Sequence, residues 1–294
     1  MEHLGILESS NEKCLNLAGW EVELNGDEQC QKVIQTQMID KDTAEQISMA
    51  MELVFREDQL VKAYLLEEGQ RQDRELLSSE RGFRFIDVAP HPIYNLVATD
   101  NADSYLGGMP PADFAMPKFD FTAPFQYLGK LSKADPAFAW LPFDLHLAAP
   151  IYLNFYQLFI DYANPKHPEV VNLDELRETE NPYDDLEPNS EVVYKRVSIQ
   201  STKSTNFEHG IGHTGVPNWI QYPNIPTCPK SNMTMRFLCQ LHYENGIKTE
   251  WTNVHPKEKG FERYFDHLNF WGDGDLYIFF EPESKVMCFM IQNT

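Results

Sequence analysis

Two stretches of the chain follow the same order of residues, and this internal repeat restricts the fold more than any other feature. Residues 107–131 (GGMPPADFAMPKFDFTAPFQYLGKL) and 214–241 (TGVPNWIQYPNIPTCPKSNMTMRFLCQL) each run from a Gly-x-Pro segment through a proline-rich excursion into an apolar strand. Each copy is followed by an aromatic stretch that leads into an acidic residue and a proline turn, at 155–165 and at 275–284. The simplest interpretation is an internal duplication of one supersecondary unit.

The first hundred residues carry different signals. In residues 17–39 apolar and polar residues alternate and then meet Asn25-Gly26, a dipeptide typical of type I′ turns, so we predict a hairpin. Residues 83–88 (FRFIDV) predict a further strand, which prolines then close.

A long amphipathic helix is predicted between these elements. Asp42 with Glu45 three residues later is typical of a capping box, and apolar residues then recur at helical spacing. We expect the helix to cover residues 42–66 and to end between Leu66 and Glu80.

Together these elements predict an α+β fold: a large, mainly antiparallel sheet of two duplicated halves, with the N-terminal hairpin and the long helix packed on it. We expect residues 1–100 to form the hairpin, helix and strand, and residues 101–294 to form the duplicated region, in one continuous globular unit. The stretch 164–191 is rich in acids and prolines, so we expect a surface connection there.

A series of short motifs in residues 100–294 carries a family resemblance. In chain order they are Gly107-Gly108-x-Pro110, FQYLGKL at 125–131, Gly215-x-Pro217-x-Trp219-Ile220-Gln221, Cys228-Pro229, MRFLCQL at 235–241, and Trp271-Gly272-Asp273-Gly274 before an aromatic strand at 275–280. The order resembles the YwqG-like family, also known as domain of unknown function 1963. The resemblance implies an α+β fold with a duplicated antiparallel sheet and no settled enzymatic activity. Some members of this bacterial family resemble immunity proteins encoded beside toxins.

Charge is the strongest feature of the composition. The chain has 45 acidic and 24 basic residues, a net charge of −21, which repels nucleic acid and attracts basic partners. Its five cysteines are scattered and odd in number, which argues against a disulfide framework and suits a reducing compartment. No apolar run is long enough to span a membrane, and no signal peptide is recognised, so we expect a cytoplasmic protein.

Neither a metal nor a cofactor is predicted. Family members often carry Cys-Pro-x-Cys-Gly where this chain has Cys228-Pro229-Lys230-Ser231-Asn232, so Cys228 lacks a second close thiolate and would need His209, His213 or His242 as partners. Residues 210–215 spell Gly-x-Gly-x-x-Gly, but the strand before it and the helix after it that a dinucleotide site needs are both missing. Residues 271–275 (WGDGD) lack the ligand spacing of a calcium loop and are interpreted as a tight turn.

Two functions from different classes remain open. The first is an immunity or inhibitor protein that occludes a cognate, basic bacterial toxin such as a nuclease, because opposite charge accelerates and orients association. The residues expected at that interface are Glu175, Glu178, Asp184, Asp185 and Glu187. A solvated loop without a partner explains the same acidic run equally well.

The second is a small-ligand-binding protein or an enzyme of unknown activity, with its pocket between the duplicated halves. The candidate lining residues come from the turn regions of the second repeat: His213, Trp219, Gln221 and Asp273. These four do not make a complete catalytic constellation, so no catalytic residue is predicted.

Overall fold

The computed structural model describes the backbone of strands between residues 7 and 75, and residues 93–293 apart from 118–123, 154, 178–185, 188, 205–206, 216, 222–223, 234 and 257–259. Within these residues no helix is both long and apolar enough to cross a membrane. The described helices are short: α1 (Leu173–Arg177) and two 3-10 turns, η1 (Pro136–Phe138) and η2 (Phe261–Phe265). The predicted α+β class is therefore wrong, and the protein is mostly β.

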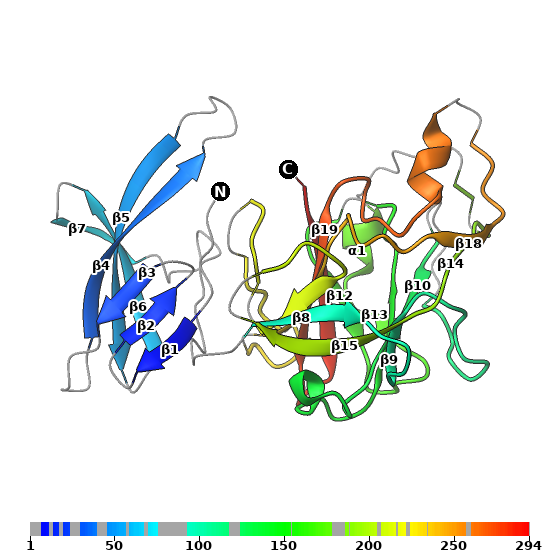
Figure 1. Ribbon diagram of the computed structural model, residues 1–294, viewed down its shortest axis with the longest axis horizontal. Helices are drawn as coiled ribbons and strands as arrows, with labels where there is room; N and C mark the ends of the chain where they lie inside the picture. The colour runs from blue at the N-terminus through cyan, green and yellow to red at the C-terminus, as the bar shows by residue number, and fades with distance from the viewer. Residues whose placement is uncertain are drawn as a thin grey trace.

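The N-terminal strands form two small antiparallel sheets (Figure 1, blue to cyan). One has the order β1-β2-β3 and the other β4-β5-β6-β7. Their bounds are β1 Leu7–Asn11, β2 Cys14–Leu17, β3 Trp20–Glu23, β4 Cys30–Ile39, β5 Gln46–Arg56, β6 Gln59–Glu67 and β7 Gln70–Glu75. The predicted hairpin within 17–39 is wrong, because β3 pairs with β2 while β4 pairs with β5.

The predicted long helix is wrong as well, because β5 and β6 occupy its residues. In β5 every second residue is apolar (Ile47, Met49, Met51 and Leu53), which is the alternation of a strand. The same segment also has apolar residues at helical spacing, so it fits both patterns. Ten residues of β4 pair with β5, and such a partner satisfies the backbone hydrogen bonds that a helix would have made internally. The strand predicted at 83–88 lies outside the described residues.

The rest of the chain forms a large antiparallel sheet of eleven strands, in the order β11-β10-β9-β15-β8-β16-β17-β19-β20-β12-β13 (Figure 1). Its strands are β8 Ile93–Ala98, β9 Ser104–Leu106, β10 Gln126–Leu131, β11 Leu145–Ala149, β12 Leu158–Asp161, β13 Glu169–Val170, β15 Val197–Ser204, β16 Gly212–Thr214, β17 Arg236–Leu241, β19 Asp275–Glu281 and β20 Val286–Gln292. A separate pair joins β14 (Val192–Tyr194) to β18 (Thr249–Thr252). The expected large antiparallel sheet is thus present without the long helix.

The registers of the sheet support the internal repeat. Tyr105 on β9 pairs with Lys130 on β10, and at the same place in the second copy His213 on β16 pairs with Gln240 on β17. The next strand pairs share an irregularity: the register shifts between Tyr127 and Gly129 on β10, and between Phe237 and Cys239 on β17. Sequence alignment of FQYLGKL with MRFLCQL matches these same positions.

The two halves meet at β8 and β15, and all of β8 pairs with residues 199–204 of β15 (Figure 1). Asn95 on β8 pairs with His213, and Ser198 on β15 pairs with Tyr105, so Asn95 and Ser198 are equivalent. The first strand of each half therefore lies against the other half, around an approximate two-fold axis. Because β8 precedes residue 100, the large sheet begins before the expected start of the duplicated region.

One part of the expected repeat is corrected. The stretch 155–165 was matched with 275–284, but its strand β12 pairs with β20 beyond the second half. The counterpart of β19 is β11, because β10 pairs with β11 as β17 pairs with β19. The sequences FDLHLAAP (143–150) and GDLYIFFEP (274–282) carry this match.

Both faces of the sheet centre are covered. The main core contains residues of β11 and of β12, from opposite ends of the strand order, so the sheet curls around one apolar interior. On the other face, Trp219 and Cys228 from the proline-rich excursion pack on Tyr277 and Phe279 of β19. Every residue of β19 and β20 is buried, which explains why these strands are apolar without alternation.

Gly129 provides a test of how closely β10 and β9 approach. Its φ is +136°, and a Cβ added there would lie 2.2 Å from the carbonyl oxygen of Tyr105. We expect Gly129→Ala to lower the free energy of unfolding by about 3 kcal/mol or more, because backbone strain and a backbone clash add. Gly246→Ala is the control: φ is +75° but the space is open, so only about 1–2 kcal/mol should be lost. Equal losses in urea unfolding would contradict the close approach.

Candidate functional site

The four residues predicted to line a pocket do not converge on one. His213 on β16 and Trp219 in the excursion are buried, Gln221 is partly buried, and Asp273 is exposed in the turn before β19. Gln221 instead binds the residues at the end of β20: its N–H donates to Oε1 of Gln292 (3.1 Å), and its Nε2 donates to the carbonyl of Asn293 (2.9 Å).

His213 belongs to a buried polar cluster centred on Asp275, the first residue of β19. Oδ2 of Asp275 accepts from Nε2 of Gln240 (2.8 Å) and lies 2.8 Å from Nδ1 of His242. Oδ1 accepts from the backbone N–H of Tyr243 (3.0 Å). On its other side, Nε2 of His242 lies 3.2 Å from Nδ1 of His213. An Asp–His–His chain results, an arrangement that can pass a proton between its members.

The first half contains an equivalent set of hydrogen bonds around Asp144, the counterpart of Asp275, with other side chains as partners. Oδ1 of Asp144 accepts from the backbone N–H of Lys133 (3.0 Å) and from the hydroxyl of Ser132 (3.1 Å), and Oδ2 accepts from Nζ of Lys130 (3.3 Å). Lys133, Ser132 and Lys130 occupy the positions of Tyr243, His242 and Gln240. The repetition indicates that this carboxylate is first of all a clamp between neighbouring strands.

Each proline-rich excursion returns an aromatic ring to the same place on the sheet. Trp219 stacks on Tyr277 with ring centroids 4.9 Å apart, and in the first half Phe114 lies 5.2 Å from the ring of His146, the residue equivalent to Tyr277. The hydroxyl of Tyr277 also donates to the carbonyl of Asn218 (2.6 Å) and accepts from the N–H of Ile220 (2.9 Å). Trp219 is thus an architectural residue.

A second polar cluster lies beneath Phe114. The hydroxyl of Tyr127 lies 3.0 Å from that of Tyr105 and 2.7 Å from Nδ1 of His146. Burial, together with the nearby Tyr105 hydroxyl, raises the pKa of Tyr127 strongly, so its hydroxyl stays protonated. Burial and the positive charge of Lys130 lower the pKa of His146, which favours the neutral imidazole.

Cys228 is buried and lies 3.1 Å from the hydroxyl of Ser284. Burial alone would raise the pKa of its thiol, but hydrogen bonds from the Ser231 and Ser284 hydroxyls and from nearby backbone N–H groups outweigh that effect and lower it. Among the described residues no group of three His, Cys, Asp or Glu side chains is placed to hold a metal ion.

Of the acids predicted at a partner interface, two are described. Glu175 in α1 is partly buried, and its Oε1 accepts from the backbone N–H of Tyr156, whereas Glu187 is exposed. Glu178, Asp184 and Asp185 lie outside the described residues.

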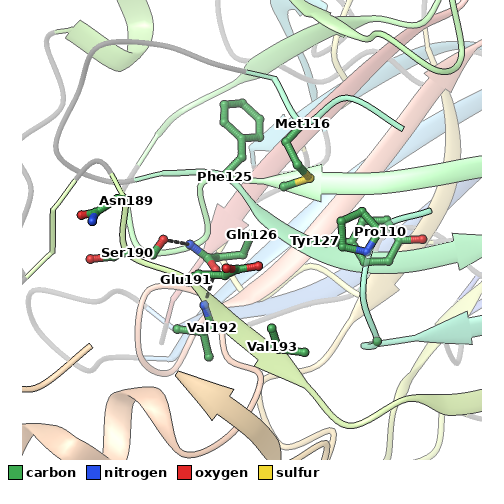
Figure 2. A pocket seen from close by; sticks show the side chains of 11 residues that line it. Pro110, Met116, Phe125, Gln126, Tyr127, Asn189, Ser190, Glu191, Val192 and Val193 are labelled. Atoms are coloured by element: carbon green, nitrogen blue, oxygen red, sulfur yellow. Dashed lines mark hydrogen bonds between the residues drawn. The ribbon is translucent and has the colours of Figure 1, made fainter. Parts of the chain in front are cut away.

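The pocket in Figure 2, of about 210 Å³, lies between β10 and the segment that leads into β14, and Gln126 closes its floor by accepting from Val192 N–H (2.8 Å) and donating to Ser190 O (3.4 Å). A pocket of about 380 Å³ is lined by 95–98, Val197, 208–212 and 245–247. A third, of about 190 Å³, is lined by 102–104, 134–136 and 199–200.

The 380 Å³ pocket lies between the duplicated halves, where a pocket was predicted, but other residues form it. His213 is not among the residues that line this pocket, although the adjacent Gly212 is. The missed carboxylates Asp144 and Asp275 had a sequence signal, the shared Asp-Leu at the start of β11 and β19.

No family model matches the chain, and neither the curated proteins nor the solved structures yielded a match. The resemblance to the YwqG-like family therefore stays a prediction that rests on its motifs.

Replacement of the clamp aspartate by asparagine should reduce stability by different amounts in the two halves. Asp275 is almost fully buried, while the Asp144 side chain is 40% exposed. We expect Asp275→Asn to lower the free energy of unfolding by about 2 kcal/mol, because a buried carboxylate loses charge-assisted hydrogen bonds, and Asp144→Asn by less than about 1 kcal/mol. Urea unfolding of both variants checks this; a larger loss at Asp144 would contradict the assignment.

The lowered pKa of His146 predicts a pH dependence. Since the unfolded chain binds this proton more readily, the stability from neutral His146 is present above its ordinary pKa of 6.5 and is lost as pH falls through the lower folded value. Between pH 7 and pH 5 the wild type should therefore lose more stability than His146→Gln. Parallel losses in the two proteins would show that His146 does not titrate abnormally.

Proposed function

We propose that the chain is a cytoplasmic immunity or inhibitor protein that binds a cognate, basic bacterial toxin and neutralises it by occlusion. The net charge of −21 is the observation that carries the proposal, because a large charge of one sign steers a partner of opposite sign and favours complementary contacts. The resemblance to the YwqG-like family, some members of which resemble immunity proteins, points the same way.

The buried polar groups are compatible with a binding role. The clamps at Asp144 and Asp275 repeat in both halves and hold strands together, so their hydrogen bonds have a structural explanation that requires no substrate. Glu191 is exposed and lines the Figure 2 pocket, and Glu187, four residues before it in the chain, is exposed as well. A basic partner could approach these carboxylates without unfolding any described element.

The test is co-expression with the product of the neighbouring gene, followed by co-purification and a growth-rescue assay. We expect a stable complex, rescue of growth, and an association rate that falls steeply as salt is raised. A neighbouring product that is toxic yet neither binds nor is neutralised would overturn the proposal.

The interface is tested by neutralising Glu175, Glu178, Asp184, Asp185 and Glu187 together to Gln or Asn. We expect slower association and about tenfold weaker binding, because rim charges act mainly on the association rate. The matched control neutralises five exposed acids outside residues 164–191 and should change binding little: Asp100, Asp103, Glu244, Glu250 and Glu283. Equal effects of the two sets would remove the acidic run from the interface and leave the toxin-binding proposal standing.

A further inference from the structure

The 190 Å³ and 380 Å³ pockets are counterparts in the two halves. Matching the first copy to the second through the strand registers places residues 102–104 on 210–212, and residues 135–136 on 245–246. These are the segments that line the two pockets. The repeat has thus produced the same gap twice, and the two gaps can be compared atom by atom.

Each gap begins where the pairing of two neighbouring strands ends. In the second half, β8 pairs with β16 only as far as Leu96. In an antiparallel ladder every second residue turns its N–H and C=O to the same side. Thr99 donates its N–H to Ser198 on β15 (2.9 Å), so the preceding Ala98 directs its own N–H and C=O to the opposite side, toward Gly210. Ala98 and Gly210 both line the pocket, which lies where the next two hydrogen bonds of the ladder, between Ala98 and Gly210, would otherwise form.

In the first half a carboxylate of the protein itself occupies that place. There β15 pairs with β9 as far as Ile199, and Ser201, the counterpart of Ala98, is the next residue that faces the gap. Oδ2 of Asp135 accepts from the backbone N–H of Ser201 (2.8 Å). Oδ1 accepts from the Ser201 hydroxyl and from the N–H of Ala137 (3.0 Å).

In the second half the matching residue is Asn245, and its side chain is turned away from β8. Oδ1 accepts from the N–H of Ile247 (2.9 Å), while Nδ2 donates to the carbonyls of His242 (2.6 Å) and Leu268 (2.8 Å). The edge of β8 at Ala98 is therefore left to the pocket, which is about 380 Å³ against 190 Å³ in the first half.

We propose that the larger pocket binds a small zwitterion of the α-amino acid class with an apolar side chain. Its carboxylate takes the N–H of Ala98, as Asp135 takes that of Ser201. Its ammonium group is complemented by the Ala98 carbonyl and by Glu208, an exposed carboxylate in the pocket wall. Apolar residues that line the remaining space are Leu96, Val97, Val197, Ile211 and Ile247.

Glu208 decides between ligand classes. A plain carboxylate would meet repulsion from Glu208, and a plain amine would offer no acceptor to the Ala98 N–H, so a ligand that carries both charges complements both groups. The volume falls within the range of about 300–1,000 Å³ that is usual for small-molecule sites. The proposal rests on the twin gap and is independent of toxin binding.

The probe is L-leucine, titrated into the full chain labelled with ¹⁵N. We expect saturable 1:1 binding with amide shifts at Ala98 and Gly210, and at least about fivefold weaker binding of 4-methylpentanoate and of 3-methylbutylamine, each of which lacks one charge. Lack of saturable binding up to about 10 mM L-leucine, or shifts confined to other strands, would overturn the proposal.

Two variants sharpen the test. Glu208→Gln should weaken L-leucine about fivefold without weakening 4-methylpentanoate, while the control Glu169→Gln on β13 should change neither. Asn245→Asp cannot donate to the His242 carbonyl, so its carboxylate should turn to Ala98, shift that amide in the free protein and block L-leucine. Unchanged L-leucine binding in both Glu208→Gln and Asn245→Asp refutes the site.

Discussion

The pairing of β8 with β15 is the constraint on which the rest of the large sheet depends. These strands open the two halves of the repeat, and each pairs with the second strand of the other half instead of its own: β8 pairs with β16, and β15 with β9. Neither half can complete its sheet alone, because each would leave an unpaired strand edge. The registers that this exchange sets are shared by both halves, so the gaps, bulges and clamps recur at matching positions.

Comparison of the two clamps shows which of their hydrogen bonds recur in both halves and which differ. Asp144 and Asp275 both accept from a backbone N–H just beyond the end of the neighbouring strand, and that bond recurs because it fixes the strand end. Their side-chain partners have diverged, from Lys130 to Gln240 and from Ser132 to His242. The second half thus keeps the geometry of the first while its charge balance differs. A buried Asp–His–His chain is accordingly compatible with a purely structural origin.

The difference between the two halves that most affects their pockets is the exchange of Asp135 for Asn245 at matching positions. Both make the same local turn through a bond to the N–H two residues ahead, so the backbone is preserved. A carboxylate at this position reaches across to the next strand, whereas an amide is held back by two carbonyl groups. The two halves thus differ at this position by one exchange of oxygen for nitrogen, and the gap beside the carboxylate is the smaller of the two.

The sequence by itself determined the repeat and the acidic net charge, because these depend on residue order and on composition. It misled at residues 46–67, where apolar residues satisfy both helical and strand spacing and only the long pairing with a neighbouring strand decides between them. It also matched the wrong stretch to β19, since an aromatic pattern is shared by many buried strands while the short Asp-Leu signal at Asp144 and Asp275 is easily passed over. The exchange of β8 and β15, and with it the pocket between the halves, was decided only by the tertiary structure, because pairing between strands a hundred residues apart is a property of register and not of local sequence.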